Sequence, residues 1–383
     1  MFVRVLHVLN ADADVAMEEV DVSTVVADDK TAVPGCFDTS PDHYGKHGLG
    51  LYVRDVDLEA DGRYRIRFDG LGLYARVYWD GAQVAECRLP YSTFEVDVAA
   101  AHGTHRLAVL VGNCYWEQEW SPLYRTGDDY YAFGGIYRSV TLERLPDGLF
   151  LERVQVFTAD LAKRSVRLRF LFGGDVADGP AEVALAFDKG EESKLTLDVR
   201  DGAAEALLTV PGGQVWSPAS PHLHTLTAAC RSDAVVERFG LRMIATSGES
   251  ILLNGEKIYL QGFNRHESHP EFGPVQTDQL MLDDLKWLRD IGANYIRAVH
   301  YQQDPPFSRT VRRTRLPRLG GEHRLGRRRR TPRRALVHAA RRRAEPPHDP
   351  QRDQQPLRDL LVLPQRGRQR RARRGSALRN GRR

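Results

Sequence analysis

Two short polar segments carry the side chains that are best suited to chemistry. Asn264, Arg265 and His266 follow the strand-like run IYLQGF, and Arg297 and His300 lie in the strand-like run NYIRAVH. A guanidinium binds a carboxylate through two parallel hydrogen bonds, and an imidazole changes charge near neutral pH. If the two runs are parallel neighbours in a barrel, their carboxyl ends meet at the face where ligands bind. These residue types could therefore bind a polar ligand.

Each of these side chains also has a structural interpretation. His266 and His300 could be hydrogen-bonded core histidines, and Arg265 and Arg297 could pair with structural acids instead of pocket carboxylates. We expect Asn264 to orient its loop by hydrogen bonding. The residues alone leave these alternatives open.

The elements around these segments have a helical period between two strands. From Thr277 onward the apolar residues fall on one stripe, which comprises Met281, Leu285, Leu288 and Ile291. Thr277 is the predicted N-cap and Gly292 the predicted stop. A strand, a helix and a second strand within about 45 residues predict a βαβ unit, the opening of either an α/β barrel or a doubly wound sheet.

The preceding residues alternate with the period of β-strands. In residues 1–146, one face is shared by Tyr64, Ile66 and Phe68, and another by Leu107, Val109 and Val111. Trp79–Gly81 predicts a tight hairpin turn. In residues 147–245, the runs VRLRFLF, EVALAF, KLTLDV and ALLTV predict a seven-strand immunoglobulin-like sandwich. Two β-sandwiches are therefore expected before the βαβ unit.

The charge divides the chain at about residue 307. Residues 1–307 hold 29 basic and 46 acidic residues, whereas 308–383 hold 26 arginines, no lysine and five acids. The second part also lacks Phe, Tyr, Trp, Ile, Met and Cys, so it cannot bury enough apolar surface to fold. We expect a disordered tail that adheres to polyanions without specific nucleic-acid recognition, because aromatic residues are absent.

Cysteine use and hydropathy bear on the compartment. Cys36, Cys87, Cys114 and Cys230 form no CxxC pair, which favours reduced, packed thiols in a cytoplasmic protein. The start MFVRVLHVLN is too short for a signal peptide, and no run reaches the roughly 18–20 apolar residues of a membrane span. A cytoplasmic location without membrane contact is expected.

Several longer motifs occur in one order along the chain. They are VPGCFD, RFDG, DYYAFGGIYR, VWSPASP, ERFGLR, LLNGEKIYLQGFNRHESHP and IRAVHYQQDP. Over about residues 30–307 the chain resembles glycoside hydrolase family 2, the β-galactosidases and β-glucuronidases. The resemblance implies a jelly-roll sugar-binding domain (1–146), an immunoglobulin-like domain (147–245) and the incomplete start of a (β/α)8 TIM barrel (246–307). Such enzymes retain anomeric configuration by using two glutamates about 5 Å apart.

The resemblance also implies roles for individual residues. Asp129 matches an acid that binds sugar hydroxyls, with an exposed turn acid as the alternative, and His266 and His300 match pocket positions. Glu267 and Glu271 match neither catalytic glutamate, so no catalytic residue is expected in this chain. The aromatic cluster YWEQEW (residues 115–120) could stack on a sugar or pack at an interface.

The tail predicts where the missing acid/base glutamate lies. With permitted codons, Arg312–Gly326 read one base later spells DELGFLVWEENIGWG, and Gln354–Gly367 spells NNPSVIFWSFLNEG. The second resembles the acid/base strand of the family, with its glutamate codon across Arg366 and Gly367. The hypothesis is a one-base frameshift near Phe307–Ser308, which leaves a truncated chain followed by an out-of-frame tail.

The predicted function is hydrolysis of terminal non-reducing β-glycosides by the intact parent, β-galactosides first and β-glucuronides second. The chain as written should be inactive. The alternatives are a non-catalytic carbohydrate-binding sandwich protein and a basic-tailed nucleic-acid binder. No cofactor is expected here; Mg²⁺ in an intact parent would use ligands from the shifted region, and the parent should form homo-oligomers.

Overall fold

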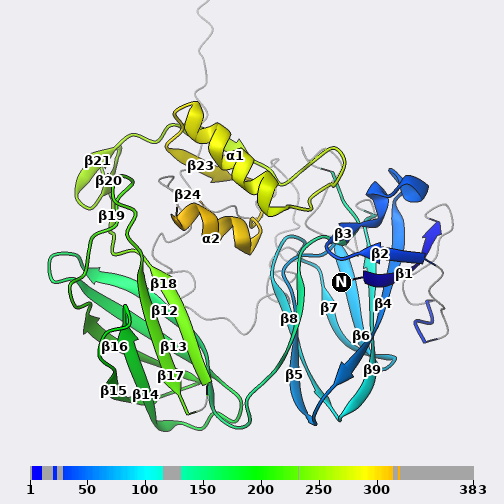
Figure 1. Ribbon diagram of the computed structural model, residues 1–383, viewed down its shortest axis with the longest axis horizontal. Helices are drawn as coiled ribbons and strands as arrows, with labels where there is room; N and C mark the ends of the chain where they lie inside the picture. Colours follow the sequence, from blue (N-terminus) through cyan, green and yellow to red (C-terminus); the bar gives the residue numbers. More distant parts are fainter. Residues whose placement is uncertain are drawn as a thin grey trace, which may run out of the picture.

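The computed structural model describes residues 2–10, 20–23, 29–114, 131–231, 233–313 and 318–319. Two β-sandwiches stand side by side, and a small unit containing the helices lies across one end of both (Figure 1). This arrangement confirms the predicted mainly β, multi-domain fold class. Asp129, the cluster at 115–120 and everything from residue 320 onward lie outside the described residues.

The first sandwich has a large sheet in the order β2-β1-β4-β9-β6-β7 and a facing sheet in the order β11-β5-β8. The large sheet comprises β1 Phe2–Asn10, β2 Asp29–Ala32, β4 Gly48–Leu58, β6 Tyr74–Trp79, β7 Ala82–Cys87 and β9 Gly103–Gly112. The facing sheet comprises β5 Gly62–Phe68, β8 Phe94–Ala100 and β11 Val140–Arg144. A short ladder joins β3 Gly35–Cys36 to β10 Gly135–Ile136, and two single-turn helices follow at Phe37–Thr39 and Pro41–His43.

The predicted alternation and hairpin of this sandwich are confirmed. Tyr64, Ile66 and Phe68 are all buried in the core between the sheets, because successive side chains of a strand point to opposite faces. Between β6 and β7, Asp80 and Gly81 both have positive φ, at 50° and 83°. Positive φ at both central residues is the geometry of a two-residue type I′ hairpin, which explains the Asp-Gly pair.

The second sandwich packs a sheet β12-β13-β16 on a sheet β15-β14-β17-β18. The strands are β12 Phe150–Asp160, β13 Ser165–Gly173, β14 Gly179–Phe187, β15 Ser193–Val199, β16 Ala203–Thr209, β17 His224–Cys230 and β18 Asp233–Phe239. Their inward residues form one apolar cluster, which includes Val166, Leu168, Phe170, Val183 and Leu226. All four runs predicted here are strands.

The last unit contains the predicted strand, helix and strand. A small sheet β19-β20-β21 precedes it, at Ile244–Ser247, Ser250–Leu253 and Glu256–Ile258. Then β22 (Gly262–Arg265), α1 (Asp278–Asp290), β23 (Tyr295–Ala298), α2 (Pro305–Arg313) and β24 (Arg318–Leu319) follow, with the three strands parallel in the order β22-β23-β24. The helices pack on this sheet through a cluster that contains Met281, Leu285, Ile296, Phe307 and Val311.

The structure confirms the predicted cap of α1 and corrects its apolar stripe. The Leu280 amide donates to the Thr277 hydroxyl at 3.2 Å, and Gly292 has a φ of 78° just past the helix end. Ile291 is 61% exposed, so its inclusion in the buried stripe is wrong, because the helix ends at Asp290. Helix α2 continues six residues past residue 307, and Val311 is buried.

Candidate functional site

The structure brings His266 and His300 together at the carboxyl ends of two parallel strands. His266 directly follows β22, and His300 lies two residues past β23. Their ring centroids are 5.5 Å apart and the rings meet edge to face at 77°. Both imidazoles are half-buried, so they can contact solvent or a ligand. The predicted meeting of the two segments at one sheet edge is therefore observed for this pair.

Asn264 and Arg297 form a second pair on the same two strands. They are register partners, and Arg297 Nη1 donates to Asn264 Oδ1 at 3.2 Å. Ile296, the neighbour of Arg297, faces the helices, so Arg297 and Asn264 face the opposite side of the sheet. In a barrel that side is the interior, and here Asn264 is exposed.

Arg265 faces the other way, into the packing between the strand and the helices. Its Nε donates to Asp284 Oδ2 at 2.9 Å, and its Nη2 donates to Gln276 Oε1 at 2.7 Å. The guanidinium also lies 4.0 Å above the Phe307 ring. Of the two interpretations of this arginine, the contacts favour pairing with structural acids.

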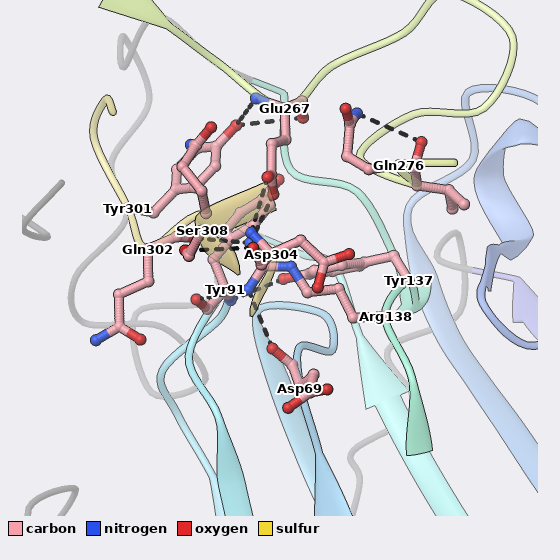
Figure 2. Close-up of polar contacts among 12 residues, drawn as sticks. Asp69, Tyr91, Tyr137, Arg138, Glu267, Gln276, Tyr301, Gln302, Asp304 and Ser308 are labelled. Atoms are coloured by element: carbon pink, nitrogen blue, oxygen red, sulfur yellow. Dashed lines mark hydrogen bonds and ion pairs between the residues drawn. The ribbon is translucent and has the colours of Figure 1, made fainter. Parts of the chain in front are cut away.

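Glu267 is the centre of a buried ion pair between the first sandwich and the barrel start (Figure 2). Arg138 Nη2 donates to Glu267 Oε2 at 2.7 Å, while Glu267 Oε1 accepts from the Asp304 amide at 2.8 Å. The Glu267 side chain is fully buried and Arg138 is nearly so. Both carboxylate oxygens are occupied and shielded from solvent, so this acid is not available for proton transfer to a substrate.

The same arginine binds three backbone carbonyls. Arg138 Nη1 donates to the carbonyls of Asp69 and Tyr91, both at 3.0 Å, and Nη2 donates to that of Gln302 at 2.6 Å (Figure 2). A planar guanidinium can satisfy several acceptors at once, which suits a buried junction. Arg138 thus joins two loops of the sandwich to the segment that follows His300.

Stacked tyrosines surround this ion pair. The rings of Tyr91 and Tyr301 lie 3.8 Å apart at 14°, one from each unit. The Tyr301 hydroxyl accepts from the Glu267 amide at 2.9 Å and donates to the Glu267 carbonyl at 3.2 Å. Burial, together with the nearby Glu267 charge, raises the pKa of Tyr301, so the phenol stays protonated and can donate.

The segment that carries Arg138 is positioned by Asp38. Asp38 Oδ2 accepts from the Gly134 amide and from Asn113 Nδ2, both at 3.2 Å. A side chain at Gly134 would lie 2.3 Å from the Phe37 ring, so only glycine fits there. Burial raises the pKa of Asp38 to about 7, although both hydrogen bonds oppose the shift.

The sequence did not reveal the roles of Asp38, Arg138 and Glu267. All three lie in motifs that stand out in the sequence, VPGCFD, GGIYR and NRHE, so their segments were visible but their pairing was not. Arg138 and Glu267 are 129 residues apart, and neither strand period nor motif spacing relates them. A buried arginine within a β-sandwich is recognisable only once its acidic partner is in place.

One group in the described part of the chain could hold a metal ion by geometry, namely Asp188, His222 and His224 in the second sandwich. However, His224 Nδ1 already lies 2.5 Å from Asp188 Oδ2, and its Nε2 accepts from the Gln214 amide at 2.9 Å. Both ring nitrogens are therefore engaged. These contacts join the end of β14 to the start of β17, the two inner strands of their sheet, so we assign the group a structural role.

Two further findings concern the cysteines and the helices. All four cysteines are buried and unpaired with one another. Within the described residues, neither helix has the length and apolar character that crossing a membrane requires.

Comparison with known families agrees with this geometry. The family model for the sugar-binding domain of glycosyl hydrolases family 2 matches residues 23–146, and that for the family's TIM-barrel domain matches residues 244–313. The chain belongs to glycosyl hydrolase family 2. The matched ranges contain both halves of the ion pair, Arg138 in the first and Glu267 in the second.

Relatives of this family-2 chain extend the comparison. It is 28% identical over 273 residues to a β-galactosidase of Lactococcus lactis, covering 67% of this chain and 26% of the relative. It is 24% identical to a putative β-glucuronidase of Formosa agariphila, covering 65% and 31%. A β-galacturonidase of Eisenbergiella tayi, solved with galacturonate, is 30% identical with a TM-score of 0.68, covering 78% of this chain and 54% of that structure. The chain spans about a quarter to a third of these curated relatives.

Proposed function

We propose that the protein encoded by an intact reading frame hydrolyses terminal non-reducing β-glycosides with retention of configuration. β-Galactosides are the first expected substrates and β-glucuronides the second. The observation that carries the proposal is the convergence of His266 and His300 at the carboxyl ends of parallel β22 and β23. Imidazoles at this edge can hydrogen-bond sugar hydroxyls, and membership of family 2 supplies the reaction class.

The chain as given lacks both glutamates that a retaining glycosidase needs, and we propose that it is inactive. Glu267, the acid that follows His266, is held by Arg138 and the Asp304 amide. The described barrel strands β22, β23 and β24 do not close a barrel, which requires more strands with a fixed tilt.

A one-base frameshift near codon 308 accounts for the arginine-rich, lysine-free composition of residues 308–383. Its support is the change from mixed charges to 26 arginines without lysine, together with two shifted-frame segments that resemble family strands. The test begins with resequencing the gene. A genomic frame that yields no Asn-Glu-Gly with its glutamate codon across Arg366 and Gly367 would remove the proposed acid/base residue.

The activity test compares the given chain with one whose gene has a single base removed near codon 308. Both are assayed with p-nitrophenyl β-galactoside, β-glucuronide and β-galacturonide; the last is included because one similar structure is a β-galacturonidase. We expect hydrolysis by the repaired protein only. Hydrolysis by the given chain would contradict the proposal that this chain lacks both catalytic glutamates.

The site itself is tested in the repaired protein. His266→Ala and His300→Ala should each lower kcat/KM about ten- to hundredfold, which corresponds to one lost hydrogen bond to substrate. His269→Ala is the matched control, because its ring stacks on Phe272 in the following loop. Full activity of both site variants would show that the histidine pair lies outside the sugar pocket.

The cytoplasmic location and the homo-oligomeric parent remain proposals from the sequence. A parent enzyme of this type would bind carbohydrate, a β-galactoside or a related sugar, as its substrate.

A further inference from the structure

One guanidinium nitrogen of the first sandwich contacts the chain beside both site histidines. Arg138 Nη2 donates to Glu267 Oε2 at 2.7 Å and to the Gln302 carbonyl at 2.6 Å (Figure 2). Glu267 directly follows His266, and Gln302 lies two residues past His300. Each residue has only two soft backbone dihedrals, so fixing one residue restricts where its neighbours can lie. A single buried group therefore restricts both segments that carry the imidazoles.

A tyrosine links these two segments to each other. The Tyr301 hydroxyl accepts from the Glu267 amide at 2.9 Å and donates to the Glu267 carbonyl at 3.2 Å. The Tyr301 ring also stacks on Tyr91 of the first sandwich, with the centroids 3.8 Å apart. Glu267 and Tyr301 are the residues that follow the two histidines, so both are held to one another and to the sandwich.

The sheet of the barrel start does not extend to the histidines. The regular pairing of β22 with β23 ends at Arg265 and Ala298, before either imidazole. Without Arg138, the Glu267 carboxylate would keep Arg265 Nη1 as its cation, at 3.4 Å from its other oxygen. The carboxylate would then be drawn toward the helices, and the adjacent His266 would move with it.

We propose that Arg138 is a positioning residue for the sugar site, which holds His266 and His300 in the arrangement that receives the substrate. The inference rests on the proposed function, because it concerns the same site. The Arg138 side chain is 1% exposed, so it acts through the two segments and does not touch the sugar. Its four acceptors suit the fixed fork of a guanidinium, whereas a lysine would keep the charge and lose part of the contacts.

The first test uses the full chain as given and requires no activity. Histidine rings labelled with carbon-13 are observed by NMR, and the two site rings are assigned by their loss in His266→Gln and His300→Gln. We expect a nuclear Overhauser cross-peak between the two rings, because their centroids are 5.5 Å apart. Arg138→Met should abolish the cross-peak and shift both ring signals.

Leu58→Ala is the matched control for lost stability. Leu58 is the last residue of β4 and is buried in the core of the same sandwich, so its truncation also lowers the melting temperature. It should leave the cross-peak intact. If Arg138→Met does not fold, Arg138→Lys and Tyr301→Phe replace it, and each should weaken the cross-peak. The proposal is overturned by a missing cross-peak in the parent, by an unchanged one in a folded Arg138 variant, or by an equal loss in Leu58→Ala.

The second test measures kinetics in the repaired protein. Arg138→Lys should lower kcat/KM about tenfold, because the imidazoles are misplaced, and Leu58→Ala should leave it unchanged. With both histidines already replaced by alanine, Arg138→Lys should have no further effect, because Arg138 acts through the imidazoles. A tenfold loss in both backgrounds would overturn the proposal. If the repaired protein hydrolyses none of the three substrates, the proposed function fails, while the NMR comparison still decides whether Arg138 positions the pair.

Discussion

The two β-sandwiches differ in what their interiors contain. The second has one apolar core, and among its described residues the buried polar side chains are Ser165 and His224. His224 is satisfied within the sandwich by Asp188 and Gln214. The first buries Asp38, Asn113 and Arg138, and the acidic partner of Arg138 lies outside the sandwich.

This difference indicates different tasks. In the second sandwich the buried His224 has both its partners within the same sandwich, so we expect this domain to depend less on its neighbours. The first contains a buried arginine whose acidic partner, Glu267, comes from the barrel start. A buried charge without a partner is strongly destabilising, so this sandwich reaches full stability only with the barrel start docked. Four predictions test this contrast, in order of decreasing effect.

Arg138→Met should lower the free energy of unfolding by about 3 kcal/mol, because the buried Glu267 loses its closest cation and keeps only Arg265 Nη1, at 3.4 Å. Urea unfolding of the full chain, followed by tryptophan fluorescence, measures the loss. Adding Glu267→Gln should restore part of it. Arg200→Met, which breaks an exposed pair with Asp198, is the control and should cost under about 1 kcal/mol. A loss below about 1 kcal/mol in Arg138→Met would mean that the ion pair does not join the two units.

Leu168→Ala in the core of the second sandwich should cost about 3 kcal/mol, because it leaves a cavity among fully buried residues. The same unfolding measurement should find this loss additive with that of Arg138→Met to within about 0.5 kcal/mol. A larger coupling would show that the second sandwich is not independent of the junction.

Stability should fall as pH rises from about 4 to 7, in part because of Asp38. Its pKa is raised from 3.8 to about 7 by burial, so the folded state holds a proton that the unfolded state has released, and that stabilisation is lost as pH rises. The full shift corresponds to about 4 kcal/mol at 1.36 kcal/mol per pKa unit, and relaxation of the site reduces the expected effect to about 2 kcal/mol. Asp38→Asn should remove this slope in melting curves between pH 4 and 8. An unchanged slope in Asp38→Asn would contradict the assignment of this pH dependence to Asp38.

Thr277→Ala should cost about 1 kcal/mol, because the Leu280 amide loses its cap at the start of α1. The matched control is Thr246→Ala on β19, a strand that precedes the barrel unit. Thermal unfolding followed by far-ultraviolet circular dichroism measures the difference. A cost equal to that of the control would show that the barrel-start helix is held by packing alone.

Much of the fold could be predicted from the sequence because its signals are local. The alternation of Tyr64, Ile66 and Phe68 predicts a half-buried strand, and Asp80-Gly81 predicts the hairpin. The predicted apolar stripe of α1 is wrong at Ile291, because the apolar spacing in the sequence continues past Asp290, where the helix ends. The two polar segments also met as the parallel βαβ pattern predicts, since His266 and His300 follow adjacent strands.

The sequence by itself determined the strand and helix periods, the cap of α1, the change in composition near residue 307 and the motifs of family 2. Only the tertiary structure decided that Arg265 faces the helices and that Glu267 is committed to Arg138. The physical reason is that secondary structure depends on residues a few positions apart, which the sequence displays directly. The state of a buried charge depends on partners brought from far along the chain, as across the 129 residues between Arg138 and Glu267.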